Sequence, residues 1–293
     1  MNCFELMRKV LEEEYTQISG SEAERDALVS GALLQLTNHY RNVSNNGPAN
    51  YKDRVIRLAY LYCYTTAHAN LVYQLVKGLQ PLSNLFDRSA VEVSCVGCGP
   101  GSDYLGILKY IMLHGKRPKL RCNMFDREPG WMESWSEVDR KVETEFQHSL
   151  SFMAFDVTKP EQWQPHTKYY RSDLFTFVYF LSELIPHEKI ATAYFATLMQ
   201  QAKPDALFLF IDNNVYHQYS WFDRMAKANG LCVLNHGEGP IELPSRTDPG
   251  YEQPASLGRF ANKFRQPDGT GIWFPKLRAS AAYRLVRKSG GGY

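Results

Sequence analysis

Apolar residues recur at helical spacing through residues 1–80, and the pattern then changes to short runs that are typical of strands. The stretches 27–40 and 53–77 repeat apolar positions at intervals that predict helices. A Ser-Asn-Asn-Gly-Pro run at 44–48 separates the two stretches, because glycine and proline interrupt helices. We therefore predict a helical N-terminal cap over residues 1–80.

From residue 90 onward, short apolar runs alternate with amphipathic helical stretches. The predicted strands are 91–96, 120–125, 150–155, 174–180, 206–211, 231–234 and 281–287, and the predicted helices are 103–113, 134–146, 187–201 and 216–229. Strands that alternate with helices form βαβ units, whose strands run mostly parallel. The pattern predicts an α/β domain over residues 90–293 with a doubly wound, mostly parallel, Rossmann-like sheet.

Composition narrows the class of protein. The chain has 293 residues, of which 44% are hydrophobic and 22% charged, as in folded globular proteins. No apolar segment approaches the roughly 20 residues that cross a membrane, and Glu5 and Arg8 distinguish the N-terminus from a secretory signal. The six cysteines are too scattered for a disulfide framework. We expect an intracellular protein, cytoplasmic or nuclear, without membrane association.

The net charge of +2 is unevenly distributed along the chain. Residues 256–293 carry eight Lys and Arg residues against one Asp, so the rest of the chain is net negative. A basic block of this kind can contact a polyanion such as RNA. It can also be the solvated outer face of an edge strand, and the charge alone does not decide between the two.

A glycine-rich turn, Gly97-Cys98-Gly99-Pro100-Gly101-Ser102-Asp103, joins the first predicted strand of the α/β domain to its first helix. Ligands of doubly wound sheets bind beyond the carboxyl ends of the strands, and glycines allow close approach to the backbone. A dinucleotide site favours G-x-G-x-x-G, whereas this turn is G-x-G-x-G and Pro100 has no N–H. The Gly-Lys-Ser/Thr ending of a P-loop is absent. The remaining interpretation is a nucleoside without phosphates, such as S-adenosylmethionine.

Two acidic residues follow the next two predicted strands. Asp126 lies about where an acidic residue accepts hydrogen bonds from ribose hydroxyls. Asp156 follows the third strand, where a side chain can receive an adenine amino group. Each alone can be a helix N-cap, but together, behind the glycine turn, they predict a nucleoside site.

With these residues in place, residues 90 to about 288 resemble the class I S-adenosylmethionine-dependent methyltransferases, most strongly over 92–101. The resemblance implies a methyltransferase-type sheet in which the three glycines line the methionine portion. It further implies that Asp126 holds the ribose and that Asp156 and Val157 flank the adenine. The cofactor-binding residues that we infer from it are Gly97, Cys98, Gly99, Gly101, Asp103, Asp126, Arg127, Asp156, Val157 and Phe180.

The segment 173–183 resembles the fourth motif of that family, whose strand end faces the methyl group. It lacks the Asn/Asp-Pro-Pro-Tyr/Phe sequence that enzymes methylating exocyclic or amide nitrogens often carry. The catalytic candidates are Tyr179 and Glu183. Glu183 can act as a general base or fix a substrate donor, or it can be a carboxylate that complements a helix start. Tyr179 can face the methyl donor or belong to the core.

Cys95 and Cys98 form a Cys-x-x-Cys pair, a spacing found in redox and zinc sites. No second cysteine or histidine pair stands at a spacing that would complete a zinc site, and glycines separate Cys98 from the helix start. We interpret the pair as small side chains that fill a tight turn, and we expect no metal.

Three hypotheses about function remain open, and we favour an S-adenosylmethionine-dependent methyltransferase that acts on RNA over the other two. The basic C-terminal segment favours an RNA methyltransferase, and the helical cap favours a methyltransferase for a small molecule or protein side chain. The third is a sensor or scaffold that binds S-adenosylmethionine without turnover. The Tyr-rich stretch 51–64, with Arg54 and Arg57, can close over the site or pack against the sheet.

Overall fold

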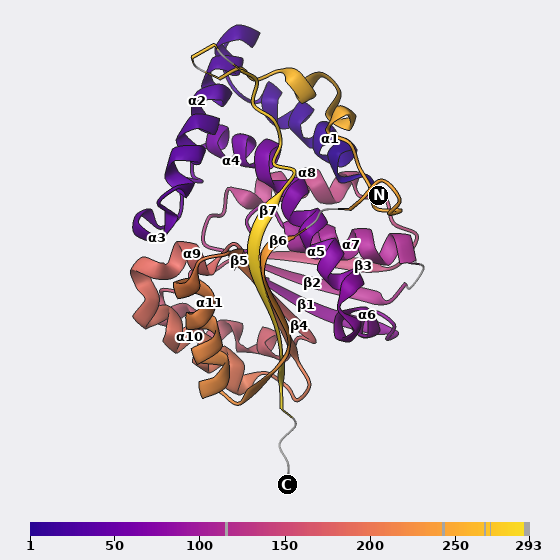
Figure 1. Ribbon diagram of the computed structural model, residues 1–293, viewed down its shortest axis with the longest axis vertical. Coiled ribbons are helices and arrows are strands. Elements are labelled where there is room, and N and C mark those ends of the chain that lie inside the picture. Colours follow the sequence, from indigo (N-terminus) through magenta and orange to yellow (C-terminus); the bar gives the residue numbers. More distant parts are fainter. Residues whose placement is uncertain (115–116, 242–243, 267, 270, 290–293) are drawn as a thin grey trace.

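A computed structural model describes residues 1–114, 117–241, 244–266, 268–269 and 271–289. Its centre is a seven-stranded sheet in the order β3-β2-β1-β4-β5-β7-β6 (Figure 1). Strands β1 to β5 run parallel, and β7 is antiparallel to both β5 and β6. The strands are β1 (Ala90–Val96), β2 (Lys119–Asp126), β3 (His148–Ala154), β4 (Leu174–Val178), β5 (Leu207–Asn213), β6 (Leu231–Ile241) and β7 (Ala279–Lys288).

Helices cover both faces of this sheet, so that its central strands are apolar on both sides. One face packs against the N-terminal helices with α7 and α8, and the other packs against α10 and α11 (Figure 1). The fold class predicted from the sequence is confirmed. The helices are α1 (Cys3–Thr16), α2 (Glu22–Tyr40), α3 (Val43–Asn46), α4 (Arg54–Tyr60), α5 (Thr66–Gly78), α6 (Gln80–Leu85), α7 (Ser102–His114), α8 (Trp131–Lys141), α9 (Leu181–Leu184), α10 (Glu188–Gln201) and α11 (Tyr216–Ala228).

Several predicted elements differ from the observed ones at their ends. The helix predicted over 134–146 begins and ends earlier, as α8, and the strand predicted over 231–234 is longer, as β6. The strand predicted over 174–180 ends at Val178, because Tyr179 takes a positive φ of 54° that no strand residue adopts. The stretch 53–77 is helical but contains a π-helical turn, Leu61–Thr65, between α4 and α5.

The segment between β6 and β7 crosses back over the N-terminal helices before the chain returns to the sheet (Figure 1). The Cys3 N–H donates to Glu252 Oε1 at 2.8 Å, and the Tyr62 hydroxyl donates to the Trp273 carbonyl at 2.6 Å. Lys109 Nζ, on α7, donates to Glu252 Oε1 at 2.5 Å. The N-terminal helices thus share one hydrophobic core with the sheet, and a division into cap and domain stays a prediction. No helix in the described ranges has the length and apolarity to cross a membrane.

Candidate functional site

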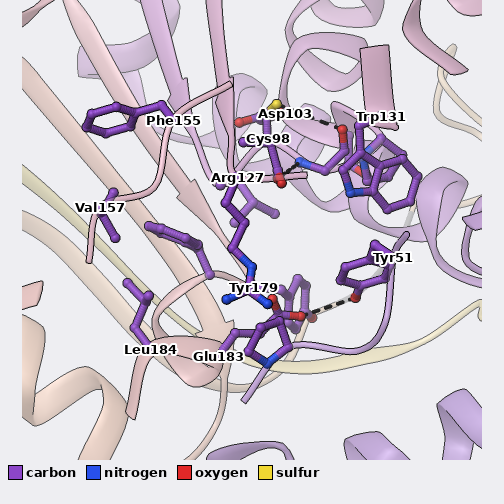
Figure 2. A pocket seen from close by; sticks show the side chains of 18 of the residues that line it. Tyr51, Cys98, Asp103, Arg127, Trp131, Phe155, Val157, Tyr179, Glu183 and Leu184 are labelled. Atoms are coloured by element: carbon purple, nitrogen blue, oxygen red, sulfur yellow. Dashed lines mark hydrogen bonds between the residues drawn. The ribbon is translucent and has the colours of Figure 1, made fainter. Parts of the chain in front are cut away.

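The carboxyl ends of β1, β2 and β4 meet where the strand order reverses, which is the ligand position of doubly wound sheets. A pocket of about 780 Å³, its open mouth included, lies there, and we call it the strand-end pocket (Figure 2). Its lining comes mainly from the glycine turn, the segments that follow β2, β3 and β4, and the N-terminal region. The lining residues are Pro48, Tyr51, Tyr60, His68, Gly97, Cys98, Gly99, Pro100, Ser102, Asp103, Asp126, Arg127, Trp131, Phe155, Asp156, Val157, Thr158, Val178, Tyr179, Phe180, Glu183 and Leu184.

The three glycines of the turn have positive φ angles of 68°, 47° and 67°, which favour glycine. A Cβ on Gly97 would lie 2.0 Å from the Phe180 ring, so Gly97 makes room for that ring. A Cβ on Gly101 would lie 1.5 Å from Trp135, and Gly101 does not line the pocket. Gly99 has only Trp131 within reach, at 3.9 Å. Gly99 is therefore the glycine that leaves open space for a ligand, and Gly101 serves ring packing instead.

Every backbone N–H between Gly97 and Gly101 already has a partner inside the protein. The N–H groups of Gly97 and Cys98 donate to the Phe125 carbonyl at 2.8 and 3.0 Å. Gly99 donates to Asp126 Oδ2 at 2.8 Å, and Gly101 donates to the Cys98 carbonyl at 2.6 Å. Pro100 has no N–H. Residues 97–101 consequently offer no free N–H donors to the cradle that the pyrophosphate of a dinucleotide requires.

Asp126 holds the turn and faces the pocket at the same time. Its Oδ2 accepts the Gly99 N–H, and its Oδ1 accepts the Glu128 N–H at 2.9 Å. Each carboxylate oxygen retains a lone pair that can accept a hydroxyl. Burial raises the pKa of Asp126 to about 6, and the two backbone hydrogen bonds oppose that shift.

The third strand supplies the apolar wall where the resemblance places the adenine. Phe155 and Val157 lie together on one side of the pocket, opposite Trp131 and Tyr51 (Figure 2). Asp156 Oδ1 accepts from the Thr158 N–H at 2.9 Å and from its hydroxyl at 2.6 Å. Asp156 thus forms a local turn as well as lining the pocket.

The other inferred cofactor residues also line the pocket, with different surroundings. Asp103 is buried and accepts the Thr176 hydroxyl at 2.5 Å, and burial raises its pKa. Cys98 is buried beside the turn, and burial raises the pKa of its thiol. The Arg127 side chain extends across the pocket towards Tyr179 and Glu183 (Figure 2).

Glu183, in the first turn of α9, accepts hydrogen bonds from two tyrosine hydroxyls, those of Tyr40 at the end of α2 and Tyr51 in the turn before α4. Tyr51 donates to Glu183 Oε1 at 3.2 Å and Tyr40 donates at 3.4 Å, and the two hydroxyls also contact each other. Burial, with the negative charge of Asp126, raises the pKa of Glu183 to about 8. A carboxyl group with this pKa exchanges a proton near neutral pH.

Tyr179 lies between two cavities. Its ring stacks on His68, with centroids 4.0 Å apart, and both residues line the strand-end pocket. On the far side of Tyr60, His68 and Tyr179 lies a second hollow of about 1060 Å³, its mouth included, which we call the aromatic pocket. It is lined by Thr37, Tyr40, Arg41, Tyr60, Cys63, Tyr64, His68, Tyr179, Ser182, Asn213, Trp273, Phe274 and Lys276.

The sequence did not identify several of these residues. The Tyr-rich stretch does cover the site, since Tyr51 and Tyr60 line the strand-end pocket. Arg54 and Arg57, however, pair with Glu133 at 2.7 and 3.2 Å. Trp131, His68 and the residues 273–276 carried no motif that places them at a site.

The remaining sequence features have mainly structural partners. Cys95 Sγ lies 3.5 Å from Cys122 Sγ rather than beside Cys98 in a common site. Within the described ranges, no three His, Cys, Asp or Glu residues gather as a metal site, and the expectation of no metal stays a prediction. In the basic segment, Lys263 pairs with Glu22 and Asp26, and the buried Arg284 pairs with Asp223 and Glu238.

Comparisons with known proteins find solved structures that are similar over much of the chain. No protein-family model matches the chain, and no curated protein matches it. An O-methyltransferase family protein from Burkholderia thailandensis is similar over 90% of this chain and 73% of its own, with 12% identity and a TM-score of 0.49. An N-methyltransferase from Bradyrhizobium japonicum, solved with S-adenosylhomocysteine, is similar over 87% of this chain and 98% of its own, with 10% identity and a TM-score of 0.40.

A third structure, a methyltransferase from Methanosarcina mazei, is similar over 72% of this chain and 98% of its own, at 10% identity and a TM-score of 0.44. Likenesses at these identities and scores decide nothing about the reaction or the acceptor. The strand order and the glycine turn at its reversal are features of this chain itself. The chain has a seven-stranded, mostly parallel, Rossmann-like sheet, the fold class predicted from its sequence.

Proposed function

We propose that the protein is an S-adenosylmethionine-dependent methyltransferase that acts on a small-molecule acceptor. The observation that carries this proposal is the glycine turn, whose N–H groups from Gly97 to Gly101 are engaged while Gly99 leaves open space beside the Asp126 carboxylate. That arrangement suits a nucleoside without phosphates better than a dinucleotide, because a pyrophosphate depends on free N–H donors.

The residues of the strand-end pocket fit the cofactor part by part. The open backbone at Gly99 would face the methionine portion, and the Asp126 carboxylate would accept ribose hydroxyls through its remaining lone pairs. Phe155 and Val157 would cover the adenine. When bound, the cofactor supplies a methyl group on a positively charged sulfur.

Glu183 is the residue that we assign as general base. Its carboxylate would accept the proton that an acceptor hydroxyl or amine loses as its lone pair attacks the methyl carbon. The Tyr51 and Tyr40 hydroxyls hold Oε1 in place, so Oε2 remains for the acceptor. With a pKa of about 8, Glu183 gains the ionised form as the pH rises through neutrality. Orientation of the acceptor supplies the remainder of the rate enhancement.

The charge distribution supports a small molecule more than RNA as the acceptor. Lys263 and Arg284 of the basic segment face carboxylates, and the Arg259 guanidinium lies 4.9 Å from the Phe260 ring centroid. Cations already paired inside the protein release fewer counterions when a phosphate backbone binds. The aromatic pocket next to the strand-end pocket instead offers a cavity of small-molecule size.

Transfer of labelled methyl groups tests this proposal. The protein is incubated with labelled S-adenosylmethionine and with separate small-molecule, protein and RNA fractions of a cell extract. We expect label in the small-molecule fraction, and a Glu183→Gln variant should retain cofactor binding while transferring label much more slowly. Label in the RNA fraction alone would restore the RNA hypothesis. Cofactor binding without label in any fraction would favour the sensor or scaffold.

A further inference from the structure

We propose that the aromatic pocket binds a planar aromatic molecule that carries an anionic group, and that the Lys276 ammonium recognises this anion. The identification of the molecule as the methyl acceptor rests on the proposed function, whereas its binding does not. The inference draws on the ring walls of the pocket, its balance of charges and three buried polar atoms without partners.

The walls of the pocket are a continuous set of rings. The Tyr40 and Tyr64 centroids lie 5.4 Å apart, and those of Tyr60 and Tyr64 lie 5.0 Å apart. His68, stacked on Tyr179, continues the wall. Flat apolar surfaces of this kind favour planar aromatic ligands, which gain stacking or edge contacts of about 0.5–1.5 kcal/mol per ring pair.

Lys276 supplies the charge. Its Nζ lies 5.4 Å from the Tyr179 ring centroid and 5.8 Å from that of Tyr64. Within the described ranges, no carboxylate forms an ion pair with this ammonium, and burial lowers its pKa. The Lys276 N–H donates to the Cys63 carbonyl at 2.8 Å, so the π-helical turn fixes the backbone of Lys276. Single π-turns occur frequently at functional sites.

The charges of the lining side chains favour an anionic ligand over a cationic one. Lys276 and Arg41 line the pocket, and none of its described lining residues is Asp or Glu. Aromatic cages can also bind cations, but here the protein's own ammonium already occupies that position over two rings. A second cation would be repelled, whereas a carboxylate or phenolate would complete an ion pair in a partly buried site.

Three buried polar atoms of the lining residues support the same occupant. His68 Nε2, Tyr179 Oη and Trp273 Nε1 are buried and have no hydrogen-bond partner in the described chain. Buried polar atoms without partners are rare, because each costs about 1–3 kcal/mol. A hydroxyl and an indole N–H are donors, so a ligand rich in acceptor oxygens matches them.

The position of the pocket connects it with the proposed reaction. Tyr60, His68 and Tyr179 line both cavities, and Tyr40 of the aromatic pocket donates to Glu183 Oε1 at 3.4 Å. A molecule held by Lys276 would therefore extend towards the strand-end pocket. The positive φ of Tyr179 is a strained conformation of the kind that clusters at functional sites.

Two probes that differ mainly in charge test the inference. Calorimetry measures binding of 2-naphthoate and of its neutral counterpart, 2-naphthamide, to the full chain without cofactor. We expect the wild-type protein to bind naphthoate at least tenfold more tightly than naphthamide. Lys276→Met should abolish this preference, and Lys276→Arg should keep most of it. Lys227→Met, which removes an exposed lysine from α11, should leave it unchanged.

The outcomes separate the pocket from the proposed function. Equal affinity for the two probes, absence of naphthoate binding, or an unchanged preference in a folded Lys276→Met variant would overturn the inference. S-adenosylhomocysteine binding, measured on the same samples, serves as the independent readout. Naphthoate binding without any S-adenosylhomocysteine binding would contradict the proposed function and leave the aromatic pocket standing.

Discussion

The two pockets that meet at Tyr179 are built in opposite ways. The strand-end pocket is built mainly from the turns and carboxylates that follow β1 to β4, and residues of the N-terminal region cover it. The aromatic pocket consists of side chains from the N-terminal helices, the segment after β4, the end of β5 and the segment before β7. The first depends on the sheet, whereas the second depends on how the segment between β6 and β7 is held against the helices. Substitutions that disturb one of these supports should therefore weaken ligand binding in one pocket more than in the other.

The largest difference between the effects on the two pockets should come from the substitution Lys109→Met. The Lys109 side chain is fully buried and pairs with Glu252, and its Nζ also donates to Asn70 Oδ1 and the Gly250 carbonyl, both at 2.6 Å. Removal of one partner leaves a buried charge, which costs about 3–5 kcal/mol. We expect a loss of this size in the free energy of unfolding, measured with denaturant.

The same variant should weaken naphthoate binding more than S-adenosylhomocysteine binding, because Glu252 anchors the segment that carries Lys276. The control is Lys109→Met combined with Glu252→Met, which removes both charges and should recover part of the stability. Equal loss of both ligands in a folded Lys109→Met variant would show that the two pockets are not separable.

Gly97→Ala should damage the strand-end pocket next most strongly. The new Cβ would collide with the Phe180 ring, and the alanine backbone would have to keep the positive φ of Gly97. Gly230→Ala is the matched control, because Gly230 has the same φ of 68° and nothing within 4 Å. Both variants should lose about 1–2 kcal/mol to the backbone conformation, and Gly97→Ala should lose about 1–3 kcal/mol more through overpacking. Thermal unfolding with calorimetric S-adenosylhomocysteine binding checks this, and equal effects would contradict the Phe180 contact.

Asp126→Asn should weaken cofactor binding while leaving naphthoate binding unchanged. A hydrogen bond to a charged group contributes about 1.5–3 kcal/mol, which corresponds to roughly a 10- to 150-fold change in affinity. Calorimetry with S-adenosylhomocysteine gives the value, and the denaturation midpoint shows whether the fold persists. Wild-type affinity in a folded variant would mean that Asp126 only supports the turn through Gly99 and Glu128.

The raised pKa of Glu183 predicts a dependence of stability on pH. Below a pKa of about 8 the folded protein keeps a proton that the unfolded chain, with a pKa near 4.5, has lost. Stability should therefore fall as the pH rises towards 8, by up to about 1.4 kcal/mol per pH unit from this group. Asp126 and Asp212, with pKa values of about 6, are mostly ionised above pH 6.5.

Denaturant unfolding between pH 6.5 and 8 compares the wild-type protein with Glu183→Gln, so that the contributions of all other groups cancel. The variant should lose less stability over this range. Parallel curves for the two proteins would show that Glu183 titrates normally and would remove its assignment as a base near neutral pH.

The smallest effect is expected from Arg259→Gln combined with Arg265→Gln. If these arginines bound RNA phosphates, each substitution would reduce the slope of log affinity against log salt by about 0.7–0.9. We expect no measurable change in the salt dependence of RNA binding and none in naphthoate or cofactor binding. A slope reduced by about one unit or more would favour RNA as a partner of the basic segment.

The contrast between the pockets also explains what the sequence can predict. The alternation of strands and helices, the glycine turn and the acidic residue Asp126 are local patterns, and the structure places them as a single site. The sequence placed Gly101 beside the methionine portion, whereas in the structure Gly101 makes room for the Trp135 ring. Only the packing of the folded chain brings Trp135 to this position. Nothing in the local pattern indicates that the π-helical turn at Cys63 accepts a hydrogen bond from Lys276. Such a contact joins segments far apart in sequence, and tertiary packing decides it.

Calorimetric titration of the wild-type protein with S-adenosylhomocysteine and, separately, with NAD tests the central claim most directly. The engaged N–H groups of residues 97–101 and the Asp126 carboxylate beside open space predict binding of one S-adenosylhomocysteine per chain and no binding of NAD. Binding of NAD without binding of S-adenosylhomocysteine would contradict the account.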